Sequence, residues 1–567
     1  SMRAVARVVW TAGVLFLLLH PPPGQAADTT APVPAAADLG AAVDAIFARY
    51  TADTPGCAVG VSKDGKEVLS RAYGSADLEH GIANTPDTIF EAGSVSKQFT
   101  AAAILLLAQA GKLKLDDPVD QYVPELPDYG TPITLRHLLH HTSGLRDWGT
   151  VTYAAGWPRG SRVHTHAHVL DVVSRQKALN FPPGSEYSYS NTGYNLLAII
   201  VERVSGKTFA QYTRDVIFEP LGMTQTQWRD DYTRIVKGRA IAYGKAPDGF
   251  HMQMPFENVH GNGGLLTTVG DLLKWNRNFT SERVGGRALI TELQRRGRLT
   301  DGLEISYARG LVVSRYRGLP EISHSGSTAG YRAFLTRFPD PALSVAVLCN
   351  DGNAEASDLA HGVAAAFLGD ALAPPVSPSP AAVDAAVLAH WAGLYRNVRT
   401  GEPLRVTVEG GALRAEDRGV LVPQSESLFT LGDGSVRVQF RGEGVGRSFD
   451  VIGTDGDTTH YAVAAEFKPT AADLARYEGA YVSDEAEVTY TIKVEKGALF
   501  ALRRPDARFA LAPAYKDAFT NAQLPLVLFR RDASNGQIVG LSLGLGRVRD
   551  LKFRKAEEKN AIDSVNR

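Results

Sequence analysis

Residues 90–113 form a long apolar stretch that opens with two polar side chains. Its middle leaves almost no polar face, which predicts a buried helix. Ser94 and Lys97 stand at its start, one helical turn apart on the same face. The predicted helix therefore begins with a hydroxyl and an amine side by side. Its apolar positions include Phe99, Ala102, Ala103, Ile104, Leu106 and Leu107.

The apolar and polar pattern divides the chain into regions of different character. A long segment mixes helical and strand periodicity between two Pro/Ala-rich stretches. After the second stretch, short alternating runs separated by Gly, Asp and Asn predominate, which is typical of small antiparallel barrels or sandwiches. The expected division is a leader at 1–26, a flexible lead-in at 27–40, a mixed α/β region at 41–372, a linker at 373–386, β-modules at 387–469 and 470–557, and a tail at 558–567.

The two β-modules share a sequence pattern. "LAHWAGLYRNV" at Leu388 returns as "LARYEGAYVSD" at Leu474, an offset of 86 residues. "VEGGALRAE" at Val408 returns as "VEKGALFAL" at Val494 with the same offset. Two matches in one frame indicate an internal repeat, so we expect two similar β-modules behind one larger region.

The first residues have the pattern of a secretory signal. Ser1 before Met2 is interpreted as a cloning remnant, and two arginines then precede the apolar run "AGVLFLLL" and the small-residue stretch "GQAAD". Three prolines end the run well short of the ~20 apolar residues that a membrane span needs. We expect cleavage after Ala26, export to the periplasm or the medium, and no membrane anchor in the mature protein.

Composition is that of an ordinary globular protein, with 44% apolar and 21% charged residues among 567. The 60 Lys and Arg balance 61 Asp and Glu to a net charge of -1, without a long block of one sign. Because no basic stripe is present, nucleic acid is not expected as a partner.

Two cysteines, Cys57 and Cys349, lie in strand-like runs. They can pair in an oxidising compartment if those strands are neighbours. Otherwise they are buried thiols, and the sequence leaves both alternatives open.

Ser94 and Lys97 match the needs of nucleophilic catalysis. Burial disfavours the charged form of lysine, so Lys97 loses its proton more easily than a solvated amine. A neutral amine beside a hydroxyl is a general base beside a nucleophile, and the helix N-terminus adds N–H groups for an oxyanion. The alternative is an N-capping serine with a lysine that reaches solvent. Ser174 and Lys177 repeat the spacing but can point both side chains at water.

Tyr189 and Asn191 precede a second apolar helix pattern. A tyrosine hydroxyl near a lysine can relay protons, and an asparagine can hold a substrate amide with its donor and its acceptor. The alternative is a capped helix start with tyrosines packed in the core.

His324, Gly326 and Ser327 lie at the start of the first of two expected strands, which meet at "FPDPAL". Glycine permits close approach of a ligand, and an edge strand can pair with an extended peptide. The N–H group of Ser327 can complete an oxyanion hole with that of Ser94. As a lone tripeptide the motif has no specificity.

Together these segments resemble, in order and character, the three motifs of the penicillin-recognising serine hydrolases. The branch is that of class C β-lactamases, D-aminopeptidases, D-alanyl-D-alanine carboxypeptidases and related esterases. The resemblance implies a central antiparallel sheet flanked by helices over residues 41–372, and the β-modules resemble the lipocalin-like barrels of three-domain D-aminopeptidases. The matching segments are Ser94-Val95-Ser96-Lys97, Tyr189-Ser190-Asn191 and His324-Ser325-Gly326, with similar stretches that begin at Lys112, Thr134 and Gly261.

The resemblance implies a role for each motif residue. Ser94 would be the acylated nucleophile, Lys97 its proton partner, and Tyr189 the base or relay toward the leaving group and water. His324 stands where β-lactamases usually hold a lysine, and a histidine with an ordinary pKa of about 6.5 is mostly neutral at pH 7. Strong β-lactamase activity is therefore not expected. The remaining matched residues, which would contact substrate, are Asn191, Gly326 and Ser327.

No metal or cofactor is expected. His164, His166 and His168 follow Thr165 in the pattern of a capped helix, where residues i and i+2 diverge by about 200°. An extended segment would instead align the three rings. The histidines of "LRHLLHHTSG" have mixed spacing, which favours helix packing or a cleft wall.

We expect an exported serine hydrolase of small peptides or amides, aminopeptidase-like or carboxypeptidase-like, whose substrate could carry a D-residue. One alternative is an ester hydrolase or weak β-lactamase on the same site, and another is a non-catalytic ligand-binding sensor. The β-modules could narrow the cleft, where Asp484 and Asp517 offer carboxylates for a free amino terminus. The oligomeric state does not follow from the sequence.

Overall fold

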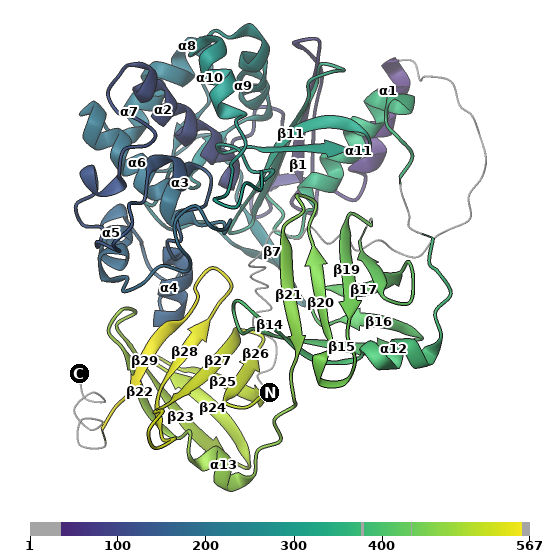
Figure 1. Cartoon of the computed structure of the whole chain (residues 1–567). Coiled ribbons are helices and arrows are strands. Elements are labelled where there is room, and N and C mark those ends of the chain that lie inside the picture. The colour runs from purple at the N-terminus through teal and green to yellow at the C-terminus, as the bar shows by residue number, and fades with distance from the viewer. Residues whose placement is uncertain (1–35, 376–378, 433, 558–567) are drawn as a thin grey trace.

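The computed structural model describes residues 36–375, 379–432 and 434–557 (Figure 1). The expected leader at 1–26, the beginning of the chain up to residue 35 and the tail at 558–567 lie outside the described residues. An α/β region comes first, and two closed antiparallel barrels follow it. No helix in the described ranges is long and apolar enough to cross a membrane.

A six-stranded antiparallel sheet forms the centre of the α/β region, in the order β10-β11-β12-β13-β1-β2. The sheet brings together the beginning and the end of the α/β region, because β1 pairs along its whole length with β13. The strands are β1 Cys57–Lys63, β2 Lys66–Tyr73, β10 Val312–Tyr316, β11 Leu319–Thr328, β12 Tyr331–Phe338 and β13 Leu343–Cys349.

The pairing of β1 with β13 places Cys57 opposite Cys349, with their Cα atoms 4.0 Å apart. The two residues form a disulfide. The structure therefore shows a disulfide and not two buried thiols. The bond links β1, the first strand of the sheet in sequence, to β13, the last.

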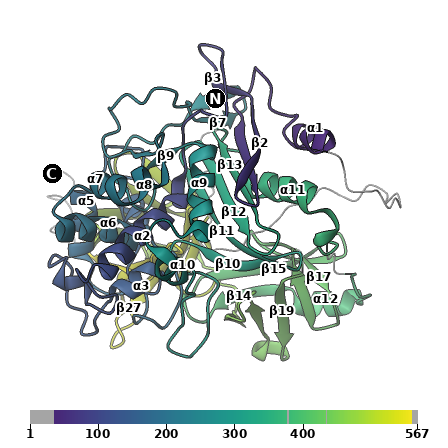
Figure 2. The same ribbon diagram turned by 90° about the horizontal axis from the view of Figure 1, so that it is seen from above.

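Helices cover both faces of the sheet, as Figure 2 shows from above. Helices α1 (Ala36–Ile46) and α11 (Ala356–Leu368) pack on one face against Val59 and Val345, and α9 (Val269–Ser281) packs on the other face. A Cβ added at Gly60 would lie 3.2 Å from the Cβ of Val269, so this glycine lets α9 approach β1 closely. Burial on both faces explains why the central strands β1 and β13 are mostly apolar, whereas β2, at the edge, is largely exposed and polar.

A helical lobe beside the sheet contains α2 and α6 at its core. The chain forms β5 (Phe90–Glu91) and the 3-10 turn η1 (Gly93–Ser96) before α2 begins at Lys97, so the predicted helix starts later than expected. Gly93 has a φ of 51°, which interrupts the backbone before the helix. The helices of the lobe are α2 Lys97–Gln109, α3 Leu135–Leu139, α4 Trp148–Ala155, α5 His166–Arg175, α6 Asn191–Ser205, α7 Phe209–Thr213, α8 Glu219–Leu221 and α10 Gly286–Leu293.

The segment after His324 differs from the predicted strand pair. Three strands are present instead of two, because β11 and β12 are joined by a tight turn at Ala329 and Gly330. Ala329 adopts a φ of 47°, which is unusual for alanine, so the sequence does not predict a turn here. β10 is the edge strand of the sheet, but its pairing with β11 ends at Ser323. From His324 to Thr328, β11 therefore pairs with β12 on one side only, and the motif lies at an open edge as expected.

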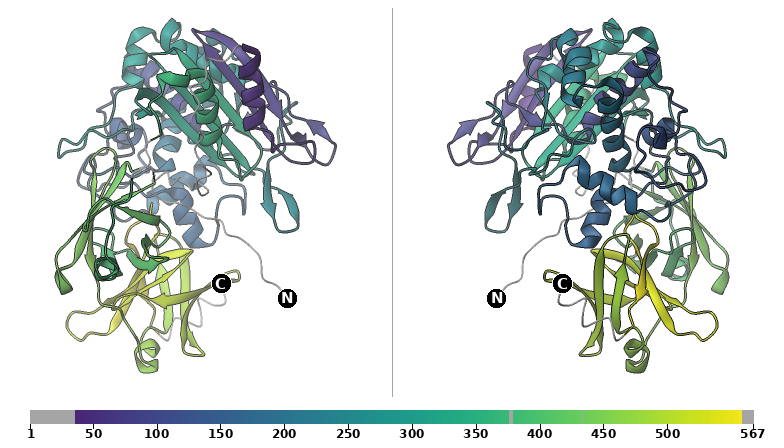
Figure 3. Two further views of the ribbon diagram at one scale, coloured as in Figure 1. Left: turned by 90° about the vertical axis from the view of Figure 1, so that its right-hand side faces the viewer. Right: turned by 90° about the vertical axis from the view of Figure 1, so that its left-hand side faces the viewer.

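Both C-terminal modules are closed eight-stranded barrels, seen from two sides in Figure 3. Each follows a short helix, α12 (Ala385–Trp391) or α13 (Ala471–Ala475). The Tyr395 hydroxyl donates to the Trp391 carbonyl at 2.8 Å, and the same bond recurs 86 residues later between Tyr481 and Tyr477 at 2.7 Å. The predicted repeat is therefore a repeated fold.

The strands of the first barrel are β14 Gly393–Asn397, β15 Pro403–Glu409, β16 Ala412–Ala415, β17 Gly419–Pro423, β18 Leu428–Leu431, β19 Val436–Arg441, β20 Ser448–Ile452 and β21 Thr458–Val463. Those of the second are β22 Gly479–Ser483, β23 Val488–Glu495, β24 Ala498–Arg503, β25 Ala507–Pro513, β26 Ala518–Asn521, β27 Leu524–Arg531, β28 Ile538–Gly544 and β29 Leu551–Lys555.

The second barrel, yellow in Figure 1, packs against the helical lobe beside α4. The Tyr490 hydroxyl donates to the Ala154 carbonyl at 2.8 Å. Arg146 and Glu485 form an ion pair across this interface, and their side chains are only 3% and 6% exposed. Apolar residues of the barrel and of the lobe form one continuous core. The barrel is therefore a fixed wall of the molecule beside the segments that carry the predicted motifs.

Candidate active site

Ser94 and Lys97 meet at the junction of η1 and α2. Lys97 is fully buried, and its Nζ lies 3.0 Å from Ser94 Oγ. The same Nζ donates to Asn191 Oδ1 at 2.9 Å and to the carbonyl oxygen of Asn262 at 2.7 Å. A lysine that reaches solvent is therefore excluded. Both side chains of the pair with the same spacing, Ser174 and Lys177, are exposed.

Burial holds the pKa of Lys97 well below its usual range, and the Arg547 and Arg159 guanidinium groups add to this effect. The neutral amine has a free lone pair. It can accept the proton of Ser94 as that hydroxyl attacks a carbonyl carbon, which is the task of a general base.

Tyr189 precedes α6, and its ring centroid lies 4.7 Å from Lys97 Nζ. Burial raises the pKa of Tyr189, and the neighbouring Ser94 hydroxyl only partly offsets this. The group is therefore a protonated phenol. Among the described residues its buried oxygen has no hydrogen-bond partner within 3.5 Å, which leaves a donor available to a substrate.

His324 lies on β11, with its ring centroid 6.3 Å from that of Tyr189. Its Nδ1 is 2.6 Å from the Ser325 carbonyl oxygen, which can only accept, so Nδ1 carries the proton. Its Nε2 then accepts from the Tyr307 hydroxyl at 3.0 Å. Burial, with a contribution from Lys97, lowers the pKa of His324 to about 3, so the third motif holds a neutral ring.

Two backbone N–H groups converge near Ser94 because β11 and η1 touch. A Cβ added at Gly93 would lie 2.6 Å from the Ser327 nitrogen, and one added at Gly326 would lie 3.2 Å from the Ser94 nitrogen. Only glycine fits at both positions. The two elements thus touch at the backbone nitrogens of Ser94 and Ser327, whose N–H groups are the candidates for an oxyanion hole.

Asn191 is the first residue of α6 and is used differently from the prediction. Its Oδ1 accepts from Lys97, and its backbone N–H donates to Asp147 Oδ2 at 2.8 Å. The acceptor that was assigned to a substrate amide is therefore occupied. Asn191 holds the lysine in place, and its side-chain amide nitrogen bonds to none of the described residues.

Four residues around the site did not emerge as site residues from the sequence: Asn262, His141, Tyr307 and Arg547. The His141 ring is buried and packs on Tyr189 with centroids 4.1 Å apart. Its Nδ1 accepts from the Ser190 N–H at 3.1 Å. Arg547 comes from the second barrel and lies over the Tyr189 ring at 4.9 Å.

The structure shows neither Asp484 nor Asp517 in contact with Ser94, Lys97, Tyr189 or His324. Asp517 binds the Arg531 guanidinium at 2.6 Å and the Tyr477 hydroxyl at 2.7 Å, all within the second barrel. Asp484 is exposed and lies 3.7 Å from Arg554. The side chain that this barrel brings to Tyr189 is a cation instead.

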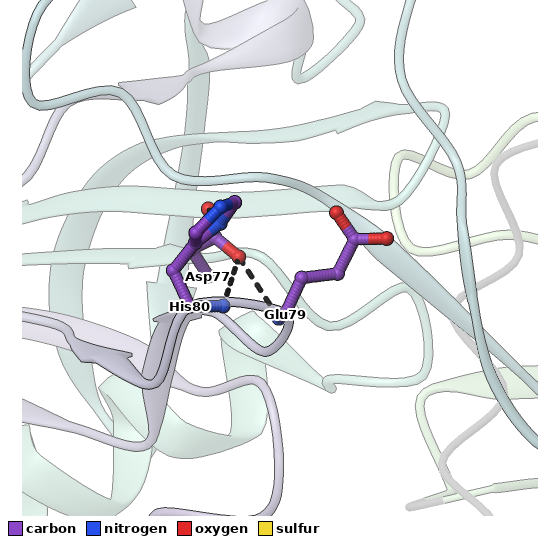
Figure 4. A group of neighbouring side chains, drawn as sticks. All are labelled: Asp77, Glu79 and His80. Atoms are coloured by element: carbon purple, nitrogen blue, oxygen red, sulfur yellow. Dashed lines mark hydrogen bonds and ion pairs between the residues drawn. The ribbon is translucent and has the colours of Figure 1, made fainter.

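His164, His166 and His168 lie around a capped helix start, as predicted, with Thr165 at the N-cap of α5. In the described part of the chain, one group of side chains is close enough to share a cation, and it does not include these histidines. The group is Asp77, Glu79 and His80, in the hairpin of β3 (Ser75–Asp77) and β4 (Ile82–Ala83) (Figure 4). Asp77 already accepts the N–H groups of Glu79 and His80 at 2.9 and 3.1 Å and contacts the His80 ring. This exposed group is a capped turn.

Comparison with known proteins agrees with this geometry. The β-lactamase family profile matches residues 43–369. The D-aminopeptidase of Gluconobacter oxydans is 30% identical over 462 residues, which cover 80% of this chain and 84% of that protein. The D-aminopeptidase of Brucella anthropi is 29% identical over 535 residues, 89% of this chain and 96% of that protein.

Among solved structures, the octameric penicillin-binding protein homologue from Pyrococcus abyssi superposes with a TM-score of 0.54 at 26% identity, covering 75% of this chain and 99% of that one. The profile, the relatives and the shared fold agree with one another. The chain therefore belongs to the β-lactamase family, and it is a D-aminopeptidase-like serine hydrolase.

Proposed function

We propose that this protein is an exported hydrolase of peptide or amide bonds in small peptides, and that it acts through an acyl-enzyme on Ser94. The observation that carries this proposal is the contact of 3.0 Å between Ser94 Oγ and a fully buried Lys97 Nζ. A lysine that only stabilised the fold would not need to be desolvated beside a hydroxyl.

In the acylation step, Ser94 Oγ adds to the substrate carbonyl carbon and its proton passes to Lys97 Nζ. The carbonyl oxygen becomes an oxyanion that the N–H groups of Ser94 and Ser327 stabilise. When the tetrahedral intermediate collapses, the bond to the leaving nitrogen breaks and an ester to Ser94 remains. Water then attacks that ester, releases the acid and returns the proton to Ser94.

The leaving amine needs a proton, and Tyr189 is placed to provide one. Its phenol is protonated, buried and without a hydrogen-bond partner among the described residues. Lys97 lies against the Tyr189 ring, so the group that takes the proton from Ser94 and the group that gives one to the leaving amine are neighbours. A proton donor at this place supports amide substrates, since an ester alkoxide leaves without such help.

The substrate class follows from the relatives and from His324. The relatives named D-aminopeptidases support an amide substrate that carries a D-residue. A neutral His324 offers no permanent charge to the carboxylate of a β-lactam, so β-lactam hydrolysis should be weak. The signal pattern of residues 1–26 supports export.

A substrate panel tests the proposal. D- and L-aminoacyl amides, the matched esters and a chromogenic β-lactam are compared for the wild type and Ser94→Ala. We expect Ser94-dependent turnover of amides and esters and little of the β-lactam. Amide turnover at background with rapid ester turnover would replace the peptidase assignment by an esterase.

A further inference from the structure

The loop of residues 545–550, between β28 and β29 of the second barrel, carries Arg547 to the candidate active site. The Arg547 Cζ lies 4.9 Å from the centroid of the Tyr189 ring. Its guanidinium is also close enough to Lys97 to affect the pKa of that amine. A barrel that follows the α/β region by more than a hundred residues thus supplies a charged side chain to the chemistry.

Hydrogen bonds and one ion pair attach this loop to the α/β region and to the first barrel. Asn180 binds it twice, since its Nδ2 donates to the Arg547 carbonyl and its Oδ1 accepts the Arg549 N–H, both at 2.9 Å. Arg549 pairs with Glu186 at 2.8 Å, and the Gly546 N–H donates to Glu402 of the first barrel at 3.2 Å. The main chain therefore positions Arg547, and its side chain is not needed to hold the loop.

The Arg547 guanidinium remains available. Its nearest carboxylate is Asp147, at 3.9 Å between Nη1 and Oδ2, and that oxygen already accepts the Asn191 N–H at 2.8 Å. The side chain of Arg547 donates no hydrogen bond to any of the described residues, and 21% of it is exposed. Five N–H donors in a planar fork are suited to bind a carboxylate through two bonds.

The other basic side chains near Ser94 offer no free positive charge. Burial favours the neutral form of Lys97, which donates to Asn191 and Asn262, and Arg159 binds Glu257. His324 is neutral, so the strand that usually supplies a cation in this family supplies none here. A substrate carboxylate beside Ser94 would therefore meet Arg547.

We propose that Arg547 binds the α-carboxylate of the leaving residue, so that the enzyme cleaves short peptides at the bond before a free C-terminal residue. This inference rests on the proposed function, in which Tyr189 faces the leaving group, and Arg547 lies over Tyr189. The products would be an acid formed from the acyl-enzyme and an amino acid with a free carboxylate.

The test uses the full chain and dipeptides of both configurations, each with a free C-terminus or as the C-terminal N-methylamide. The readout is the ratio of kcat/KM for the free acid to that for the methylamide. We expect this ratio to favour the free acid in the wild type and to fall at least about tenfold in Arg547→Gln, the loss expected for one charge-assisted hydrogen bond. Arg547→Lys should retain part of the preference, because the charge remains but the fork is lost.

Arg554→Gln is the matched control, because it removes an exposed guanidinium from β29 of the same barrel, where Arg554 lies 3.7 Å from Asp484. It should leave the ratio and the thermal midpoint nearly unchanged. Equal loss of both substrates in Arg547→Gln, or the same ratio change in Arg554→Gln, would overturn the assignment. A further substrate is a dipeptide with a glutamate side chain and a blocked C-terminus. If Arg547→Gln lost activity toward this dipeptide alone, the assignment to an α-carboxylate would be wrong.

Failure of this inference is distinguishable from failure of the proposed function. A neutral aminoacyl ester has no carboxylate to bind. Its Ser94-dependent turnover would leave the proposed function intact even when the acid preference is absent, whereas turnover that survives in Ser94→Ala would contradict the proposed function itself.

Discussion

At the scale of single residues, the site depends on one amine that the fold removes from water. Lys97 donates to Asn191 and Asn262 and faces the Ser94 hydroxyl, all within 3.0 Å, while its side chain is fully buried. A charged ammonium in such a place has a large desolvation cost, which explains why the neutral form is favoured. The neutral form is the one that can accept the proton of Ser94.

Removing this amine should abolish the chemistry, and it also leaves Asn191 Oδ1 and the Asn262 carbonyl without their donor, so stability must be measured beside activity. We expect Lys97→Ala to lower kcat/KM by about 100- to 10,000-fold, the range attributed to a general base. The control is Lys177→Ala, from the exposed pair with the same spacing, which should retain wild-type rates. Circular dichroism melts would show that both variants fold. Equal activity of Lys97→Ala and Lys177→Ala would contradict the assignment.

The pH profile should report Lys97 and not His324. Activity requires the neutral amine, so kcat/KM is present above the pKa of Lys97 and is lost as the pH falls through it. His324 has a pKa of about 3 and is already neutral across the working range. We therefore expect one acid limb in the profile of kcat/KM against pH, unchanged in His324→Gln, whose side-chain oxygen can still accept from Tyr307.

An acid limb that disappears or moves by a full unit in His324→Gln would assign the titration to the histidine instead. Comparing the profiles of the same substrate at constant ionic strength excludes screening as the cause.

At the scale of elements, the contact of β11 with η1 brings the two oxyanion donors together. Gly93 and Gly326 permit this contact because each faces the backbone of the other element. The strand position of His324 and the helical position of Asn191 then place the second and third motifs around Ser94. The site is thus a junction of a strand, a turn and two helix starts.

Gly93→Ala should separate β11 from η1. Its Cβ would lie 2.6 Å from the Ser327 nitrogen, so one oxyanion donor must move, and kcat should fall by about 100- to 1,000-fold. Gly81→Ala is the control, because Gly81 has a similar left-handed φ of 62° but open space around it. It should show a modest loss of stability, about 1 kcal/mol, with kcat unchanged. A normal kcat in Gly93→Ala would show that Ser327 N–H is not a donor.

The sequence predicted this part of the site well because its signals are local. An apolar helix that follows Ser94 and Lys97 can be recognised in one segment. The same holds for the tripeptide of residues 189–191, which ends on the first residue of α6. The turn at Ala329 and Gly330 was missed, since alanine rarely adopts a positive φ. The role of Asn191 was also missed, because its partner Lys97 lies 94 positions away.

At the scale of the whole molecule, the second barrel is docked on the region that carries the motifs. The repeat was predictable from two matched segments at one offset, and the antiparallel sheet flanked by helices from the family resemblance, but the docking of the barrel was not predictable. The pair of Arg146 with Glu485 joins residues 339 positions apart, and Arg547 reaches Tyr189 from still farther along the chain. No local pattern encodes such contacts.

The buried pair at this interface should be important for stability. Glu485→Ala would leave the Arg146 guanidinium buried without its partner, and we expect a loss of about 3–5 kcal/mol in the free energy of unfolding. The matched control is Arg508→Ala in the same barrel, whose pair with Glu495 is exposed and should change stability little. Urea unfolding followed by fluorescence measures both. Equal effects would mean that the barrel is not docked as described.

The central claim is that Ser94 is the acylated residue, and adduct mapping tests it most directly. The protein is treated with a fluorophosphonate, digested and analysed by mass spectrometry. We predict one adduct on the Ser94 peptide in the wild type and in Ser174→Ala, and none in Ser94→Ala. An adduct on another residue, or full labelling of Ser94→Ala, would contradict this account.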